Sequence, residues 1–321
     1  MKKTVIFFAA LLFVITSIAI YLGYSAKPEV PKLAGSHADQ SLLSTNLQRY
    51  YKIYIPSNLK PDSPLLLVLH GSMQSIDDIR TYTGYEFERL AEQHGFALIY
   101  PQGFKNNWND CRKSASYPAK VENIDDLAFM QALIETASKD YGIDKDKVFL
   151  SGWSNGGHLG FKAALEKPDM FAAIAAISAN LPTPDNSDCS ISDADKTGSM
   201  LIMNGTADPI NPHEGGRVTL FGFGDRGNVL SSQDSISYFA TRAGYSDSEI
   251  ETALATNPQP QGSVSIKQWQ AENKPALSLV TIQDGGHLIP QPYFRAPRIL
   301  GRNTPALNGP ELIWHFFQQA P

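Results

Sequence analysis

The stretch from residue 148 to residue 164 constrains the fold of this chain more than any other. It begins with a short apolar run typical of a buried strand, stops at Gly152, and continues after Ser154 with apolar residues at helical spacing. Gly152, Ser154 and Gly156 form a G-x-S-x-G pattern, in which small residues flank a serine with a strained backbone. We therefore expect a sharp strand-to-helix turn that holds the Ser154 hydroxyl clear at the end of a sheet.

The backbone near this turn also predicts a site for a developing negative charge. Asn155 opens the expected helix, where free N–H groups and the helix dipole favour an anion. A second apolar run, residues 64–69, is followed directly by a His-Gly step. Enzymes built on such turns take a second oxyanion donor from the backbone just after this step. We expect that donor to be the N–H of Ser72 or of Met73.

Further segments alternate between strand and helix patterns. Strands are expected at residues 49–55, 64–69, 96–100, 148–150, 172–177, 200–203 and 277–282, and helices at residues 87–94, 123–141, 232–243 and 311–317. The first strand roughly alternates, which is typical of an antiparallel edge strand, whereas residues 64–69, 96–100 and 172–177 have the pattern of strands buried on both faces. This order predicts one α/β domain with a mostly parallel sheet covered by helices on both faces and an active site at the carboxyl ends of the strands.

Two more polar residues each follow a predicted strand as Ser154 does. Asp208 comes after residues 200–203, and His287 comes after residues 277–282. The order Ser, Asp, His is characteristic of α/β-hydrolases. A serine hydroxyl is a poor nucleophile until an imidazole takes its proton, and a carboxylate must fix the tautomer of that imidazole. We predict that these three side chains form one catalytic site, and that His158, on the helix after the turn, packs instead.

Composition and charge exclude some classes of function. The net charge is -5, and acidic and basic residues are interspersed, so nucleic acid is not expected as a partner. The sequence has none of the spacings typical of metal sites, such as C-x-x-C or H-E-x-x-H. No metal and no cofactor are therefore expected.

The N-terminus has the pattern of an export segment. Two lysines precede an uncharged apolar run that is longer than the roughly 7 to 15 residues of a signal-peptide core and close to the ~20 that span a bilayer. A cleaved signal peptide and an uncleaved anchor are both open over residues 1–26. In either case the body is expected to be secreted or periplasmic, in the second case anchored to the inner membrane by residues 4–26. Residues 27–47 are expected to be a linker, and residues 48–321 the catalytic domain.

Cys111 and Cys189 are the only cysteines. An exported protein meets an oxidising environment, so we expect them to form a disulfide bond, with two unrelated buried thiols as the alternative. The loop-entropy argument gives such a bridge about 4 to 5 kcal/mol of stabilisation as an upper figure.

The motifs as a whole resemble a known family, the polyhydroxybutyrate-depolymerase-like esterases, which are related to feruloyl and acetylxylan esterases. The resemblance spans residues 49–317. It includes the segments 69–71, 123–129, 143–147, 152–157, 171–174, 204–210, 285–287 and 314–317. Membership implies the α/β-hydrolase fold, with Ser154 as nucleophile, Asp208 as acid and His287 as base. Relatives carry Trp-Pro shortly after the histidine, whereas residues 288–290 here read Leu-Ile-Pro, so a different leaving-group side is expected.

These observations predict a serine esterase that hydrolyses carboxylic esters outside the cytoplasm through an acyl-enzyme. The substrate classes are those of the family: hydroxybutyrate oligomers, feruloyl esters and acetylated polysaccharides. A serine peptidase of the same fold is one alternative. A non-catalytic envelope protein that keeps the fold is another.

Overall fold

A large mixed sheet runs through the computed structural model, which describes residues 2–191, 197–246, 250–253 and 263–320. Over these residues the sheet has 10 strands in the order β1-β2-β4-β3-β5-β6-β7-β12-β11-β10. The strands are β1 (Ser36–Ser44), β2 (Leu47–Ile55), β3 (Leu65–Leu69), β4 (Ala97–Pro101), β5 (Val148–Trp153), β6 (Ala173–Ile177), β7 (Ser199–Gly205), β10 (Ile250–Ala253), β11 (Val264–Trp269) and β12 (Leu277–Ile282). A separate small ribbon pairs β8 (Gly216–Arg217) with β9 (Asn228–Val229).

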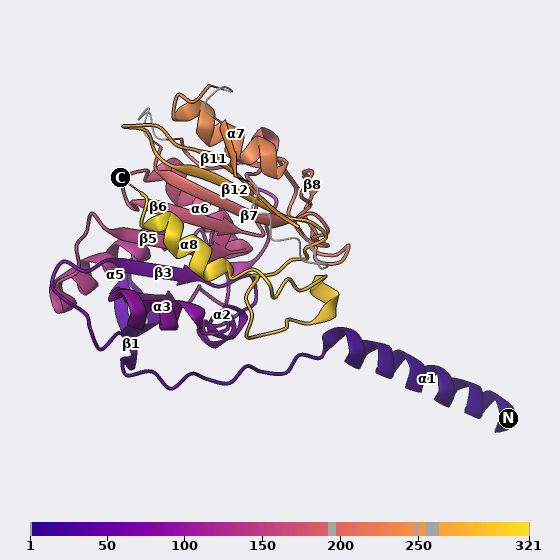
Figure 1. The fold of residues 1–321 in the computed structure, drawn as a ribbon. Helices are drawn as coiled ribbons and strands as arrows, with labels where there is room; N and C mark the ends of the chain where they lie inside the picture. The colour runs from indigo at the N-terminus through magenta and orange to yellow at the C-terminus, as the bar shows by residue number, and fades with distance from the viewer. Residues whose placement is uncertain (1, 192–196, 247–249, 254–262, 321) are drawn as a thin grey trace.

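The centre of the sheet is parallel, and both edges are antiparallel. Strands β4, β3, β5, β6, β7 and β12 pair in parallel. β1 and β2 are antiparallel at one edge, and β11 and β10 at the other. The parallel strands point toward the same end of the sheet, which is the end nearer to the N-terminal helix (Figure 1). The predicted α/β fold with a mostly parallel sheet is therefore confirmed.

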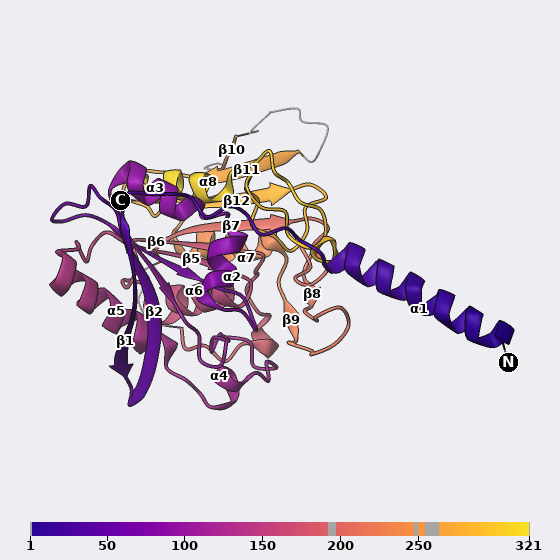
Figure 2. The same ribbon diagram turned by 90° about the horizontal axis from the view of Figure 1, so that it is seen from below.

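Helices cover both faces of the sheet (Figures 1 and 2). The covering helices are α2 (Ile76–Tyr82), α3 (Glu86–His94), α4 (Pro118–Val121), α5 (Asp126–Tyr141), α6 (Asn155–Glu166), α7 (Ser232–Arg242) and α8 (Gly309–Phe317), with 3-10 turns η1 (Pro184–Asn186) and η3 (Arg298–Leu300). A further helix, α1 (Lys2–Gly23), precedes the sheet. Successive side chains of β3 face opposite sides. Leu65 and Leu67 belong to a hydrophobic core that includes residues of α5, α6 and α7, whereas Leu66 belongs to a second core that includes residues of α2, α3 and α8. This two-sided burial explains why β3 is apolar throughout.

Residues 36–44 correct the predicted linker over residues 27–47. They form β1, which pairs with β2 along its whole length. The edge strand is therefore β1, and β2, the strand expected at the edge, lies next to it. The two strands are joined through Thr45 and Asn46, whose φ angles of 49° and 65° are those of a tight hairpin turn. Every second residue of β1 is shielded, and Ala38 and Leu42 pack against the core. The strand is polar because its other residues face solvent.

The N-terminal helix α1 projects away from the sheet (Figure 1). Arg298 in η3 donates a hydrogen bond of 3.2 Å to the carbonyl of Tyr21. In the described part of the chain, none of the helices combines the length and the apolar character that a membrane crossing requires. The anchor over residues 4–26 stays a prediction.

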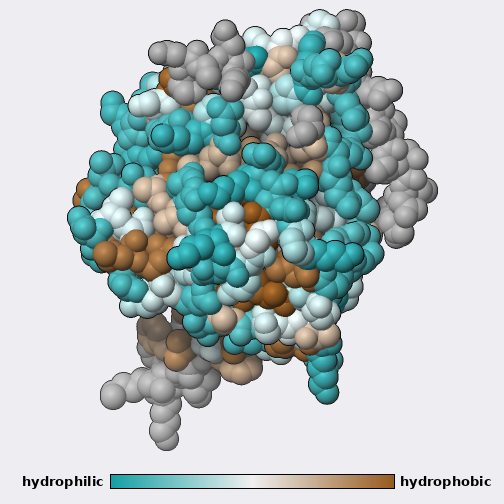
Figure 3. All heavy atoms as spheres, turned by 90° about the vertical axis from the view of Figure 1, so that its left-hand side faces the viewer, coloured by the Kyte–Doolittle hydropathy of each residue, from teal (hydrophilic) through white to brown (hydrophobic). Residues whose placement is uncertain are grey.

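The opposite end of the molecule, toward which the amino ends of the parallel strands point, is seen face-on in Figure 3. Hydrophilic side chains dominate this face, and hydrophobic residues form only small patches between them. The polar residues predicted to form the site lie at the other end.

Candidate active site

Ser154 lies at the sharp turn between β5 and α6, as the G-x-S-x-G pattern predicts. Its φ and ψ angles are 55° and -117°, a strained conformation for a residue with a side chain. A Cβ atom on Gly152 would lie 2.2 Å from the carbonyl oxygen of Gly156, and one on Gly156 would lie 2.7 Å from that of His70. Both positions therefore need glycine, because the backbone segments approach too closely for any side chain.

The predicted residue His287 lies within hydrogen-bonding distance of both Ser154 and Asp208. The His287 Nδ1–H donates to Asp208 Oδ2 at 2.7 Å, which leaves Nε2 free to accept from the Ser154 hydroxyl at 2.9 Å. The other carboxylate oxygen of Asp208 accepts from the N–H groups of Ile210 and Asn211, both at 2.8 Å. The carboxylate is therefore held from both sides, and it fixes the orientation of the imidazole.

The loop after β12 brings His287 back over the end of the sheet. A Cβ on Gly286 would lie 2.2 Å from the carbonyl oxygen of Leu300, so this loop packs backbone against backbone. The His287 N–H donates to the same carbonyl at 2.7 Å. On the other side the imidazole faces Trp153, whose ring centroid lies 5.5 Å away. His287 is only 3% exposed, so water has little access to the imidazole.

The backbone next to Ser154 distinguishes the two predicted second oxyanion donors. The Gly71 N–H donates to the Gln74 side chain at 2.9 Å, and the Met73 N–H donates to the Asn106 carbonyl at 2.8 Å. Between them, the Ser72 N–H has no acceptor among the described residues and belongs to the lining of the pocket. The Asn155 N–H opens α6, where first-turn N–H groups have no partner within the helix. This geometry favours Ser72 over Met73.

His70 has a structural role that the sequence analysis did not assign. Burial lowers its pKa to about 4, so the imidazole is neutral. Nδ1–H donates to the carbonyl of Gly71 at 2.7 Å, and Nε2 accepts from the Gly103 N–H at 2.9 Å. The carbonyl of His70 accepts from the Trp108 indole at 2.9 Å. These bonds fix the loop that carries Ser72, and the His-Gly step was the signal that pointed to it.

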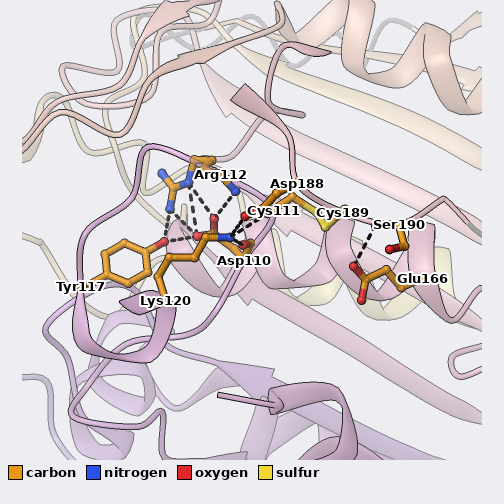
Figure 4. The surroundings of a disulfide bond; sticks show 9 residues. All are labelled: Asp110, Cys111, Arg112, Tyr117, Lys120, Glu166, Asp188, Cys189 and Ser190. Atoms are coloured by element: carbon orange, nitrogen blue, oxygen red, sulfur yellow. Dashed lines mark hydrogen bonds and ion pairs between the residues drawn. A yellow bond between two sulfur atoms is a disulfide. The ribbon is translucent and has the colours of Figure 1, made fainter. Parts of the chain in front are cut away.

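A buried polar network holds the side chain of Asn155. Its amide donates to Asp110 Oδ2 at 2.6 Å, and its carbonyl oxygen accepts from the Trp108 N–H at 2.8 Å. Asp110 also accepts from the Arg112 guanidinium at 2.6 Å and from the Tyr117 hydroxyl (Figure 4). Burial opposes the charge of Asp110, but the Arg112 guanidinium holds the pKa of this carboxyl well below its usual range. The carboxylate is thus charged, and its hydrogen bonds to Arg112, Tyr117 and Asn155 hold it beneath the site.

The structure joins Cys111 and Cys189 in a disulfide bond, with Cα atoms 5.0 Å apart. The bond ties the loop that carries Asp110 and Arg112 to the segment after η1 (Figure 4). The Asp188 N–H donates to the carbonyl of Cys111 at 3.1 Å, and the Asp188 carboxylate pairs with Lys120 at 2.7 Å. These contacts therefore anchor the loop beneath Asn155 to the segment that carries Asp188 and Cys189.

Replacing both cysteines with alanine should lower the free energy of unfolding by about 2 to 5 kcal/mol, because the bridge spans a separation of 78 residues. Urea unfolding of the two proteins measures the change. The wild-type protein in dithiothreitol is the matched control and should show the same shift. An unchanged midpoint in both would contradict a stabilising bridge.

A pocket of about 120 Å³ opens beside Ser154. It is lined by Gly71, Ser72, Met73, Gln74, Tyr82, Arg112, Trp153, Ser154, His158, Ile210, Asn211, Val218, Leu220, Arg226, His287 and Leu300. His158 is buried as predicted, but it also contributes to this lining.

Within the described ranges, no group of three or more His, Cys, Asp or Glu side chains is placed to hold a metal ion.

The parallel sheet, the strained turn and the order of the three polar residues define the α/β-hydrolase class. Residues 49–209 of the 321 match the family Esterase PHB depolymerase, and the chain belongs to that family. The predicted family and fold are therefore confirmed, and the enzyme class is that of the carboxylic ester hydrolases.

Similar proteins include several esterases. NocK of Nocardia uniformis subsp. tsuyamanensis, a candidate esterase, is 26% identical over 255 residues, which cover 76% of this chain and 71% of the relative. Feruloyl esterase B of Talaromyces stipitatus is 34% identical over 134 residues, or 41% of this chain and 36% of the relative. The bifunctional acetylxylan esterase/xylanase XynS20E of Neocallimastix patriciarum is 34% identical over 128 residues, or 39% of this chain and 17% of the relative. This chain thus matches only part of the length of the last two.

The fold is similar to that of an esterase of known structure. The acetyl xylan esterase from Aspergillus awamori superposes with a TM-score of 0.53 and 19% sequence identity, over 80% of this chain and 96% of that one. At this identity the likeness supports the fold alone.

Proposed function

We propose that this protein is a serine esterase whose catalytic residues are Ser154, His287 and Asp208. The observation that carries the proposal is the chain of hydrogen bonds from Asp208 through His287 to the Ser154 hydroxyl. An imidazole fixed in this tautomer can take the proton of the hydroxyl as the oxygen attacks. Membership of an esterase family makes a carboxylic ester the substrate on which this chemistry acts.

The reaction proceeds in two halves. Ser154 Oγ forms a bond to the ester carbonyl carbon while its proton passes to His287 Nε2. The N–H groups of Asn155 and Ser72 stabilise the oxyanion of the tetrahedral intermediate. The bond to the alcohol oxygen then breaks as His287 returns the proton to the departing alkoxide. Water, deprotonated by His287, releases the acyl group from Ser154, and no cofactor takes part.

Replacing Ser72 with proline should lower kcat for an aryl acetate by about 10²- to 10³-fold, because proline removes one oxyanion donor. Ser72→Ala is the matched control, since it keeps the N–H and loses only the hydroxyl. Steady-state rates and the unfolding temperature of both variants provide the test. A proline variant that is folded and as active as the alanine variant would rule out this donor.

We further propose that the enzyme acts outside the cytoplasm, with residues 1–26 as the export segment and the catalytic domain beginning near β1. The basic residues and the apolar run at the N-terminus support export. The disulfide bond supports an oxidising compartment. Cell fractionation with an antibody against the catalytic domain tests this location, and activity confined to the cytoplasmic fraction would contradict it.

The substrate classes we propose are those of the relatives: acetylated polysaccharides, feruloyl esters and hydroxybutyrate oligomers. A panel on the purified full-length protein should compare acetylated xylan, methyl ferulate, hydroxybutyrate oligomers, short-chain aryl esters and short peptide amides. Turnover of at least one of the ester classes and none of the amides is expected. Amide hydrolysis at rates rivalling the esters would identify a peptidase instead, and no turnover of any member would leave a non-catalytic protein.

A further inference from the structure

One part of the pocket lining carries positive charge. Arg112 and Arg226 both contribute to the wall. The imidazole of His158 also lines it, but burial and then the charge of Arg112 hold its pKa well below the usual range, so it is neutral. Arg112 comes from the loop before α4, and Arg226 from the β8–β9 hairpin, which lies near the end of the sheet that carries the candidate site (Figure 2). Loops distant in the sequence thus bring two guanidinium groups to the cavity that contains Ser154.

The two arginines differ in how their charges are compensated. Arg112 is paired with Asp110, whose carboxylate also accepts from Tyr117 (Figure 4). The same carboxylate accepts from the Asn155 amide. Among the described residues, the Arg226 side chain donates to the carbonyl of Gly224 alone, at 3.3 Å. Its neighbour in sequence, Asp225, pairs with Arg217 at 2.6 Å instead. Across the described ranges, no carboxylate lies within ion-pair distance of Arg226.

Arg226 is nevertheless partly shielded from water. Burial, and then the nearby charge of Arg112, lower the pKa of Arg226. A guanidinium held in this way gains more from a bound anion than an exposed one does, because the surrounding dielectric is lower. The conformation of the hairpin therefore keeps a cation at the pocket with no described carboxylate at ion-pair distance, although the charge of Asp110 acts on it from farther away.

Two buried polar side chains of the same lining also lack partners. His158 Nδ1 and both amide atoms of Asn211 form no hydrogen bond with any described residue. His158 is 2% exposed and Asn211 is 1% exposed. Buried polar atoms of this kind are costly unless a bound group satisfies them. The residues that carry these unpaired atoms line the same pocket as Arg226.

We propose that Arg226, with Arg112 and His158 beside it, binds a carboxylate carried by the ester substrate. The inference rests on the proposed esterase function and deepens it: the preferred substrate has a free carboxylate in addition to the ester bond. The carboxylate would accept hydrogen bonds from the Arg226 guanidinium, while the ester carbonyl faces Ser154. The contact between the carboxylate and the guanidinium is the same whether the carboxylate belongs to the acyl part or to the alcohol part of the ester.

Two matched pairs of substrates test the proposal on the full-length protein. For the acyl side, 4-nitrophenyl hemisuccinate is compared with neutral 4-nitrophenyl butyrate. For the alcohol side, 3-acetoxybutanoate is compared with its methyl ester. In at least one pair, kcat/KM should favour the anionic ester by about 10- to 100-fold, as expected for a charge-assisted hydrogen bond. The pair that shows the preference identifies which part of the substrate carries the carboxylate.

The Arg226→Gln variant should abolish this preference, mainly through a rise in KM for the anionic ester. Arg217→Gln is the matched control, because Arg217 is on the same hairpin, pairs with Asp225 and does not line the pocket. It should keep the wild-type preference. Equal rates for the anionic and neutral esters of both pairs in the wild type, or equal losses for both esters in Arg226→Gln, would overturn the proposal. Failure of the esterase function itself is distinguishable, since hydrolysis of every ester would then be insensitive to Ser154→Ala.

Discussion

The Ser154→Ala variant is expected to hydrolyse an aryl acetate with a kcat about 10⁴- to 10⁶-fold below that of the wild type. Alanine removes the hydroxyl oxygen that lies 2.9 Å from His287 Nε2, which is the atom the imidazole is placed to activate. The oxyanion donors and the pocket remain, so a residual rate above the uncatalysed reaction should persist. The change of the 4-nitrophenol absorbance with time measures both rates.

A serine on the far edge strand provides the control for Ser154→Ala. Ser41 is on β1, where its hydroxyl accepts a hydrogen bond from Gln48 at the surface. Ser41→Ala should therefore keep the wild-type kcat. If Ser154→Ala retained wild-type activity with the same purity and unfolding temperature, a different nucleophile would be at work.

Replacing Asp208 with asparagine should lower kcat by about 10³- to 10⁴-fold with little loss of stability. Asparagine has the same shape, and its carbonyl oxygen can still accept from the N–H groups of Ile210 and Asn211. Its amide would then face His287 Nδ1 as a donor. The imidazole would have to place its proton on Nε2, the atom that must accept the proton of Ser154. The measurements are kcat and the unfolding temperature.

Asp185 offers a matched control for the change at position 208, because it is also an aspartate outside the sheet but is exposed, in the 3-10 turn η1. The Asp185→Asn variant should keep the wild-type kcat. A loss of less than tenfold in Asp208→Asn would show that another group orients the imidazole.

The site was predictable to the extent that its residues follow local patterns. Close backbone contacts restrict the two positions that flank Ser154, residues 152 and 156, to glycine. The sequence must therefore show the G-x-S-x-G pattern. Asp208 and His287 each follow an apolar strand, and parallel strands end at the same edge of a sheet. Periodicity and chain order were therefore sufficient to bring the three residues together.

The network beneath the site was not predictable in this way. Asp110, Arg112 and Tyr117 come from a loop with no periodic pattern, and their contact with Asn155 depends on the path of that loop. A disulfide bond and buried hydrogen bonds decide this path, and both act between residues far apart in the sequence. The same reason applies to Arg226, whose place in the pocket depends on a hairpin.

The edge strands escaped prediction for a different reason. β1 has few apolar residues, because one of its faces is open to solvent and the tertiary pairing with β2 outweighs its weak intrinsic preference. β11 does alternate, with Val264 and Ile266 on one side and Ser265 and Lys267 on the other, and this alternation is the signal that could have found it. A polar edge strand such as β1 is thus the kind of element for which the local sequence pattern is least informative.

The central claim is that Ser154 is the nucleophile of an assembled catalytic triad. Treatment of the full-length protein with a fluorophosphonate, followed by proteolysis and mass spectrometry, tests this claim directly, because the probe reacts only with a serine activated by its neighbours. We expect one adduct, on the peptide that contains Ser154, and none in the His287→Ala variant. An unlabelled wild-type protein, or a label on any other residue, would contradict the account.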